Sequence, residues 1–125
     1  KEFTGIPGSS NWYGFGFITY SNKAKLKILG VTKDTLIEEG AVSERVVKEM
    51  AEGALRNSGS DFAISISGIA GPTGGRDDKP VGTVCFGIGT QDNINCFTEY
   101  FKGDRDEVRK QSVAFALKEL LKCLQ

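Results

Sequence analysis

The side chains of this sequence that could carry out chemistry are hydroxyls, lysines, arginines and carboxylates, because histidine is absent. That absence excludes a Ser-His-Asp triad, a Cys-His pair and every histidine-based metal site. A general base would have to be Lys, Asp, Glu or Tyr. We therefore expect no metal site, and any hydrolytic chemistry would depend on one of these four residue types.

Four polar segments lie where a loop leaves a predicted strand or precedes a predicted helix, which is where ligand sites gather in α/β folds. Each also has a structural explanation. A glycine-serine turn caps backbone amides, and Lys25 in a lysine-rich helix is typical of a solvated surface residue. Asp104 beside Arg105 is typical of an ordinary helix N-cap. The four segments are residues 8–10, 20–25, 67–75 and 103–106.

The first elements that must position these segments are a strand and a short helix. Residues 14–20 are apolar and aromatic with interspersed glycines, which predicts a strand. Ser21 or Asn22 then caps a helix that runs through Leu29 and ends at Gly30.

The remaining elements follow from periodicity and glycine-rich breaks. The 125 residues suit one domain. The order of elements predicts an α/β fold, a three-layer α/β/α sandwich with a mixed sheet. The elements predicted after Gly30 are a helix from Ser43 to residues 57–59, a strand at 62–67, a loop at 68–80, a hairpin of strands 81–88 and 94–101, and a helix capped by Asp104.

Composition narrows the classes of partner. Lys plus Arg and Asp plus Glu each number 16, so the net charge is zero, and no dense basic run predicts direct nucleic-acid binding. No apolar stretch approaches the roughly 20 residues of a membrane span, and no signal segment opens the chain. We expect a cytoplasmic protein in which Cys85, Cys96 and Cys123 are small core residues in a reducing compartment.

The polar segments carry a collinear series of motifs that covers nearly the whole chain. In chain order they are PGSS at 7–10, GFITYSNKAK at 16–25, LGV at 29–31, GAVSE at 40–44, SGIAGP at 67–72, KPVGTV at 79–84 and GDR at 103–105. This series resembles the C-terminal domain of competence/damage-inducible protein A (CinA), the nicotinamide-nucleotide amidase family. The resemblance implies deamidation of nicotinamide mononucleotide to nicotinic acid mononucleotide and ammonia, a step of pyridine nucleotide salvage, by a homo-oligomer that needs no cofactor.

The resemblance also implies a Ser–Lys mechanism. Carried over residue by residue, the second serine of GSS is Ser10, the tyrosine and lysine of YSNxAK are Tyr20 and Lys25, and the arginine of GDR is Arg105. Neutral Lys25 would be the base for Ser10, which requires a lysine pKa lowered by burial or by a nearby cation such as Arg105. The substrate-binding positions that go with them are Ser9, Asn22, Ser67, Gly68, Gly71, Gly74 and Gly75.

The nucleotide phosphate needs donors, and residues 71–75 with Arg76 and Lys79 offer amides and charge. Trp12, Tyr13 and Phe15 would either stack on a flat ring or belong to the core. Family members begin with a strand and a glycine turn whose sequence is similar to TAESCTGG. No such motif is present here, so we expect the chain to lack that part of the domain.

Two other functions stay open at this point. One is a non-catalytic module that binds a nucleotide or a protein partner and is linked to competence or the DNA-damage response. The other is an amidase with a different carboxamide substrate, because none of the motif residues is specific for a pyridine ring.

Overall fold

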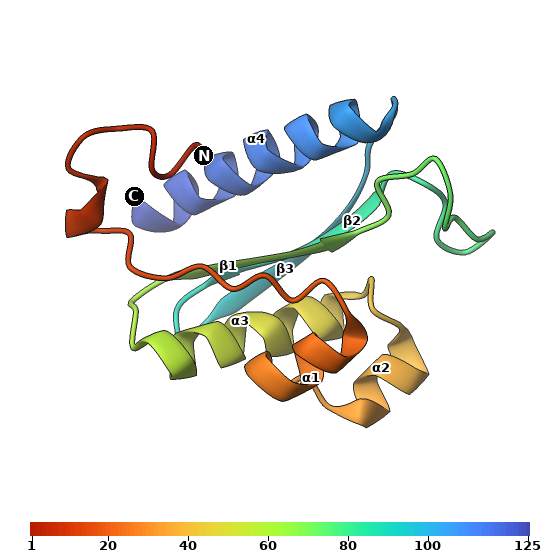
Figure 1. The fold of residues 1–125 in the computed structure, drawn as a ribbon, viewed down its shortest axis with the longest axis horizontal. Coiled ribbons are helices and arrows are strands. Elements are labelled where there is room, and N and C mark those ends of the chain that lie inside the picture. Colours follow the sequence, from red (N-terminus) through yellow and green to blue (C-terminus); the bar gives the residue numbers. More distant parts are fainter.

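The computed structural model describes residues 1–125, which form four α-helices and one three-stranded sheet (Figure 1). The α/β fold class is therefore confirmed. In chain order the elements are a 3-10 helix at Ser9–Asn11, α1 at Asn22–Leu29, α2 at Lys33–Glu39, α3 at Glu44–Ser58, β1 at Ala63–Gly68, β2 at Thr83–Gly89, β3 at Ile94–Tyr100 and α4 at Arg105–Leu124.

The sheet has the order β1-β2-β3, and both strand pairs are antiparallel. Ser67 faces Cys85 across the first pair, and Cys85 faces Thr98 across the second. The predicted hairpin of β2 and β3 is confirmed, but the expectation of a mixed sheet is wrong for the sheet that forms. The physical reason is that residues 14–20, which were expected to form a further strand, do not join it.

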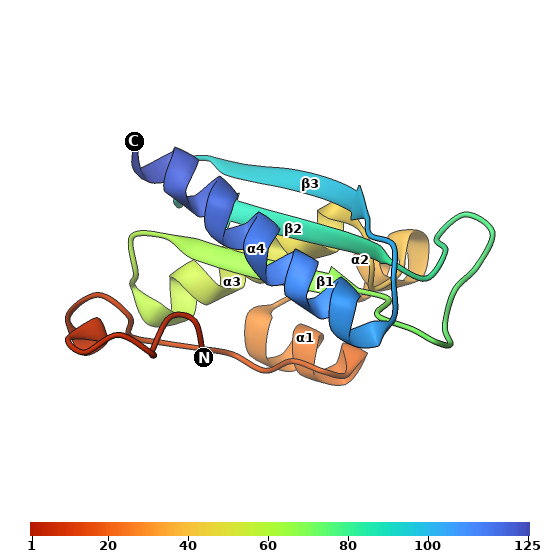
Figure 2. The same cartoon turned by 90° about the horizontal axis from the view of Figure 1, so that it is seen from above.

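Residues 14–20 belong to no strand, and their backbone groups make no backbone–backbone hydrogen bond. The segment still runs extended along the β1 side of the molecule (Figures 1 and 2). Aromatic and apolar residues thus favoured an extended conformation as expected, but a strand also needs a neighbour within hydrogen-bonding distance. A cleft separates this segment from β1, and the segment therefore has no strand to pair with.

Helices lie on both sides of the sheet. In Figure 1, α4 lies on one side, and α3 with α1 and α2 lies on the other. β2 is the central strand, and all seven of its residues are buried. Two apolar clusters result: one joins Val84, Phe86 and Ile88 of β2 to Val108 and Ala116 of α4.

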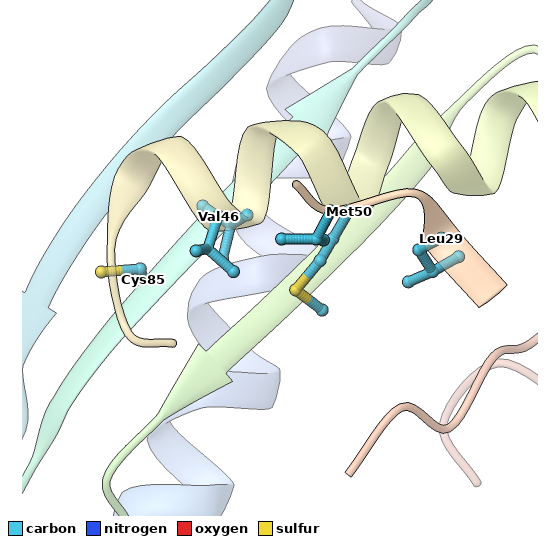
Figure 3. Packing of buried hydrophobic residues seen from close by; sticks show 6 residues of the cluster. Leu29, Val46, Met50 and Cys85 are labelled. Carbon is cyan, nitrogen blue, oxygen red and sulfur yellow. The ribbon is translucent and has the colours of Figure 1, made fainter. Parts of the chain in front are cut away.

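The second cluster joins α1, α3 and β2. Leu29, Val46, Met50 and Cys85 all belong to it (Figure 3). Cys85 is buried in this core, as expected, and burial raises the pKa of its thiol. All three cysteines are free.

The helix boundaries show how much of the local structure the sequence encodes. Ser21 caps α1 by accepting a hydrogen bond from the Ala24 amide, and Gly30 ends the helix in the left-handed conformation. Asp104 and Glu107 form a reciprocal capping box at the start of α4.

Two details of the helices differ from the sequence-based expectation. Helix α2 was not predicted, although Thr32 caps its start through the Thr35 amide. In α4 the apolar spacing predicts burial of Val108, Val113, Leu117, Leu120 and Leu121. The buried residues are instead Val108, Ser112 and Ala116, and Val113 and Leu121 are exposed. Small residues at a spacing of four let α4 approach β2 closely, and the larger apolar residues flank that contact.

None of the helices combines the length and the apolar character that crossing a bilayer requires.

Candidate active site

An open cleft of about 1370 Å³ lies between residues 14–20, β1 and α4. Its lining includes Tyr20, Asn22, Lys25, Ser67, Gly68 and Arg105, which are six of the eleven residues that the sequence singled out. Residues from the start of α1, the end of β1 and the start of α4 therefore face the same space, although 80 positions separate Lys25 from Arg105 in the sequence.

Lys25 is the most unusual residue of this cleft. Its side chain is only 7% exposed, against the expectation for a lysine in a lysine-rich helix. The Nζ donates a hydrogen bond of 2.8 Å to the Thr19 carbonyl, and no carboxylate forms an ion pair with it. Burial lowers the pKa of the Lys25 amine, because desolvation disfavours the charged form. Arg105, suggested as a second cause, does not contribute to the shift.

Tyr20 and Asn22 flank the N-cap of α1. Tyr20 is 87% exposed, and Asn22 is exposed as well. Neither side chain has a hydrogen-bond partner within the chain, so both phenol and amide are free to bind a ligand. The helix that carries them is held by α3, because Asn57 and Arg56 donate to the carbonyls of Ile28 and Leu29 at its end.

Ser67 and Gly68 are the last two residues of β1. The Ser67 hydroxyl is half-buried and donates a hydrogen bond of 2.7 Å to the Ala41 carbonyl. The Oγ lone pairs stay available as acceptors. Beyond the strand, Ala70 lines the cleft, and its amide donates to no protein acceptor.

Arg105 ties the start of α4 to the glycine-rich loop. Its Nη1 donates a hydrogen bond of 3.0 Å to the Gly71 carbonyl. Gly71 is buried and has a φ of 86°, a conformation that favours glycine. Gly74 and Gly75 lie further along the exposed part of the loop and do not line the main cleft.

Ser9 and Ser10, like Gly71, Gly74 and Gly75, lie apart from the cleft lining. They belong to the 3-10 helix Ser9–Asn11, and neither lines the cleft. The Ser10 side chain is exposed and makes no hydrogen bond within the chain. The structure therefore does not bring Ser10 next to Lys25 within one chain.

The two cations suggested for phosphate binding are engaged elsewhere. Arg76 pairs with Asp78 at 3.2 Å, and Lys79 donates to the Glu39 carbonyl at the end of α2. Arg109, which the sequence did not single out, lines the cleft one helical turn after Arg105. The i, i+4 spacing of the two arginines places them on the same face of α4. That spacing indicates a binding role only once α4 is known to border a cleft.

Comparison with known proteins agrees with this arrangement of motifs. The family model described as the CinA C-terminal domain matches residues 1–124. Nicotinamide-nucleotide amidohydrolase PncC of Shigella flexneri is 54% identical over 121 residues, a match that covers 96% of this chain and 73% of the relative. A putative competence-damage inducible protein of Symbiobacterium thermophilum is 47% identical, and the match covers 94% of this chain but 30% of that longer protein.

Solved structures share the fold. The crystal structure of competence/damage inducible protein CihA from Agrobacterium tumefaciens superposes with a TM-score of 0.92 at 41% identity, covering 96% of this chain and 74% of that one. The protein of the CinA superfamily from Escherichia coli superposes with a TM-score of 0.89 at 39% identity, covering 94% of this chain and 68% of that one. The chain therefore belongs to the CinA C-terminal domain family.

Proposed function

We propose that this protein is an amidohydrolase that converts nicotinamide mononucleotide to nicotinic acid mononucleotide and ammonia in pyridine nucleotide salvage. The observation that carries the proposal is the buried Lys25, whose amine has a lowered pKa and no carboxylate partner. Such an amine is suited to take a proton from a hydroxyl nucleophile at neutral pH. The similarity to the PncC amidohydrolases supports the choice of substrate.

The reaction would proceed through an ester. This step requires Ser10, which lies apart from the cleft in this structure, to approach the bound carboxamide. Its hydroxyl then attacks the carboxamide carbon while its proton passes to neutral Lys25. The C–N bond breaks, and the leaving nitrogen takes that proton from Lys25, directly or through the Tyr20 hydroxyl, to depart as ammonia. Water then attacks the ester, Lys25 accepts its proton, and release of the acid restores the Ser10 hydroxyl. One water is consumed, and one ammonia is formed.

The charge that develops on the carbonyl oxygen needs donors. The free amide of Ala70, a residue of the cleft lining, is suited to this role and would contribute on the order of 3 kcal/mol to the transition state. Arg105 supports that loop through the Gly71 carbonyl. The Ser67 hydroxyl would accept a hydrogen bond from the substrate amide nitrogen.

The volume of the cleft exceeds the roughly 300–1,000 Å³ of common small-molecule pockets, so the nucleotide would fill only part of it. Lys25, Ser67 and Arg105, from three different elements, are among the polar residues of its lining. We propose that the pyridine amide lies beside these three residues and that the phosphate lies toward Arg109.

Replacement of Arg109 tests the position of the phosphate. We expect Arg109→Ala to raise the KM for nicotinamide mononucleotide about tenfold, the effect of losing one hydrogen bond between charged groups. The KM for nicotinamide riboside, which has no phosphate, would change little. Lys110→Ala is the matched control, because Lys110 is exposed on the same helix but does not line the cleft. Equal effects of Arg109→Ala on both substrates would refute this position.

The reaction class itself is tested by measuring ammonia release from nicotinamide mononucleotide, nicotinamide riboside and free nicotinamide. We expect the mononucleotide to be turned over with the highest kcat/KM. A protein that prefers free nicotinamide would be an amidase of another substrate class. Binding of the mononucleotide without ammonia release would favour the alternative, a non-catalytic module linked to competence or DNA damage.

A further inference from the structure

Three consecutive carbonyls of the turn between α2 and α3 each accept a hydrogen bond from a side chain. The donors come from the glycine-rich loop, from the N-cap of α3 and from the end of β1. The three hydrogen bonds are Lys79 to Glu39, Ser43 to Gly40 at 3.0 Å and Ser67 to Ala41 at 2.7 Å. Three separate elements therefore hold this turn in place.

Ser67 is the one of these three donors that also lines the cleft. A hydroxyl has one proton and two lone pairs. Because the Ser67 proton is committed to the Ala41 carbonyl, the hydroxyl meets a ligand as a hydrogen-bond acceptor. Donation to a ligand would leave that carbonyl without a partner, since Ala41 is half-buried and its oxygen accepts no backbone hydrogen bond.

The substrate and the product of the proposed reaction differ in the group that would meet Ser67. A carboxamide nitrogen donates hydrogen bonds, whereas a carboxylate at neutral pH only accepts them. A hydroxyl held as an acceptor therefore binds the amide nitrogen and repels a carboxylate oxygen. A site whose hydrogen-bonding groups are fixed in this way discriminates between ligands of nearly equal shape.

We propose that Ser67 is a specificity-determining residue that selects the carboxamide over the carboxylate. Lys79 is a positioning residue for it: Lys79 does not line the cleft, but it fixes the turn whose Ala41 carbonyl holds the Ser67 proton. This inference rests on the proposed function, because it needs the pyridine amide to lie beside Ser67. Its consequence is that the acid formed in the reaction binds weakly and leaves the site.

The test compares the Kd of nicotinamide mononucleotide with the Kd of nicotinic acid mononucleotide by titration calorimetry, in Lys25→Met protein so that the substrate is not consumed. Adding Ser67→Ala is expected to lower the ratio of product Kd to substrate Kd about tenfold, because the amide loses its acceptor and the carboxylate loses the repulsion. Ser60→Ala is the matched control, since Ser60 lines the same cleft just before β1, and it should leave the ratio unchanged. A ratio that stays constant or rises in Ser67→Ala would overturn the proposal.

Lys79→Met tests the positioning role in the same assay. We expect it to lower the ratio as well, and we expect Lys79→Arg to restore it. An effect of charge alone has the opposite sign, because removing a cation weakens binding of the more negative product and raises the ratio. A ratio that rises or stays constant in Lys79→Met would therefore overturn the positioning role. A wild-type protein that binds both nucleotides but releases no ammonia would instead refute the proposed function.

Discussion

Replacement of Lys25 by methionine is expected to lower the kcat for deamidation by about 10³-fold or more while leaving the protein folded. The amine is the only candidate base whose pKa is shifted toward neutrality, and loss of a positioned general base costs roughly 10²–10⁴-fold. Methionine keeps the length and apolar stem of lysine. Rates measured at saturating substrate, together with the far-UV circular dichroism of the variant, test this expectation.

The matched control is Lys27→Met, because Lys27 lies on the exposed face of the same helix. It removes the same charge from α1 and is expected to keep wild-type kcat. If Lys27→Met lost as much activity as Lys25→Met, the effect would come from the charge of the helix rather than from the buried amine.

Lys25→Met is also expected to change how the stability of the protein depends on pH. Since burial lowers the Lys25 pKa, the unfolded chain binds more protons than the folded one between that lowered pKa and the ordinary value of 10.5. The free energy of unfolding should therefore rise with pH through this window. Lys25→Met should lose this rise, and at neutral pH it should be at least as stable as the wild type. Urea unfolding at several pH values measures both effects.

Replacement of Gly53 by alanine is expected to destabilise the fold by about 3 kcal/mol. Gly53 lies inside α3, where the end of α1 crosses, and a Cβ there would come within 1.8 Å of the Leu29 carbonyl oxygen. Alanine in a helix gains roughly 1 kcal/mol over glycine, but a backbone contact that short can be relieved only by moving α1. Denaturant unfolding measures the net cost.

The loss should extend to function, because α1 carries Lys25. A shift of about 1 Å in a catalytic group can cost on the order of 10²-fold in rate. Gly14→Ala is the control for stability, since a Cβ at Gly14 would meet no atom within 4 Å. A Gly53→Ala protein as stable as the wild type would show that α1 and α3 are not in close contact.

Local signals predicted the elements of this fold well. The predicted helix starts at Ser21 or Asn22, at Ser43 and at Asp104, and the break at Gly30, depend on residues within one turn of the chain, and the structure has N-caps at Ser21, Ser43 and Asp104. Helix α2 has a similar N-cap at Thr32 but is only seven residues long, too short for a periodic apolar pattern to be recognised.

Long-range contacts decided what the sequence alone could not predict. The burial of Lys25 depends on the Thr19 carbonyl and on the cleft wall, and the contact of Arg105 with Gly71 joins residues 34 positions apart. Residues 14–20 have the composition of a strand, yet pairing requires a neighbouring strand that composition cannot reveal. The motif resemblance named Ser10 and Lys25 together, but it contained no information on the distance between them.

The central claim is that the chemistry is deamidation of nicotinamide mononucleotide, and ammonia release measures it most directly. The assay should compare this chain with a version preceded by a family segment that carries the TAESCTGG-like strand and turn. We expect one ammonia and one nicotinic acid mononucleotide per substrate consumed by the extended version, and no turnover once Lys25→Met is introduced. A folded extended protein that binds the mononucleotide but releases no ammonia would contradict the claim.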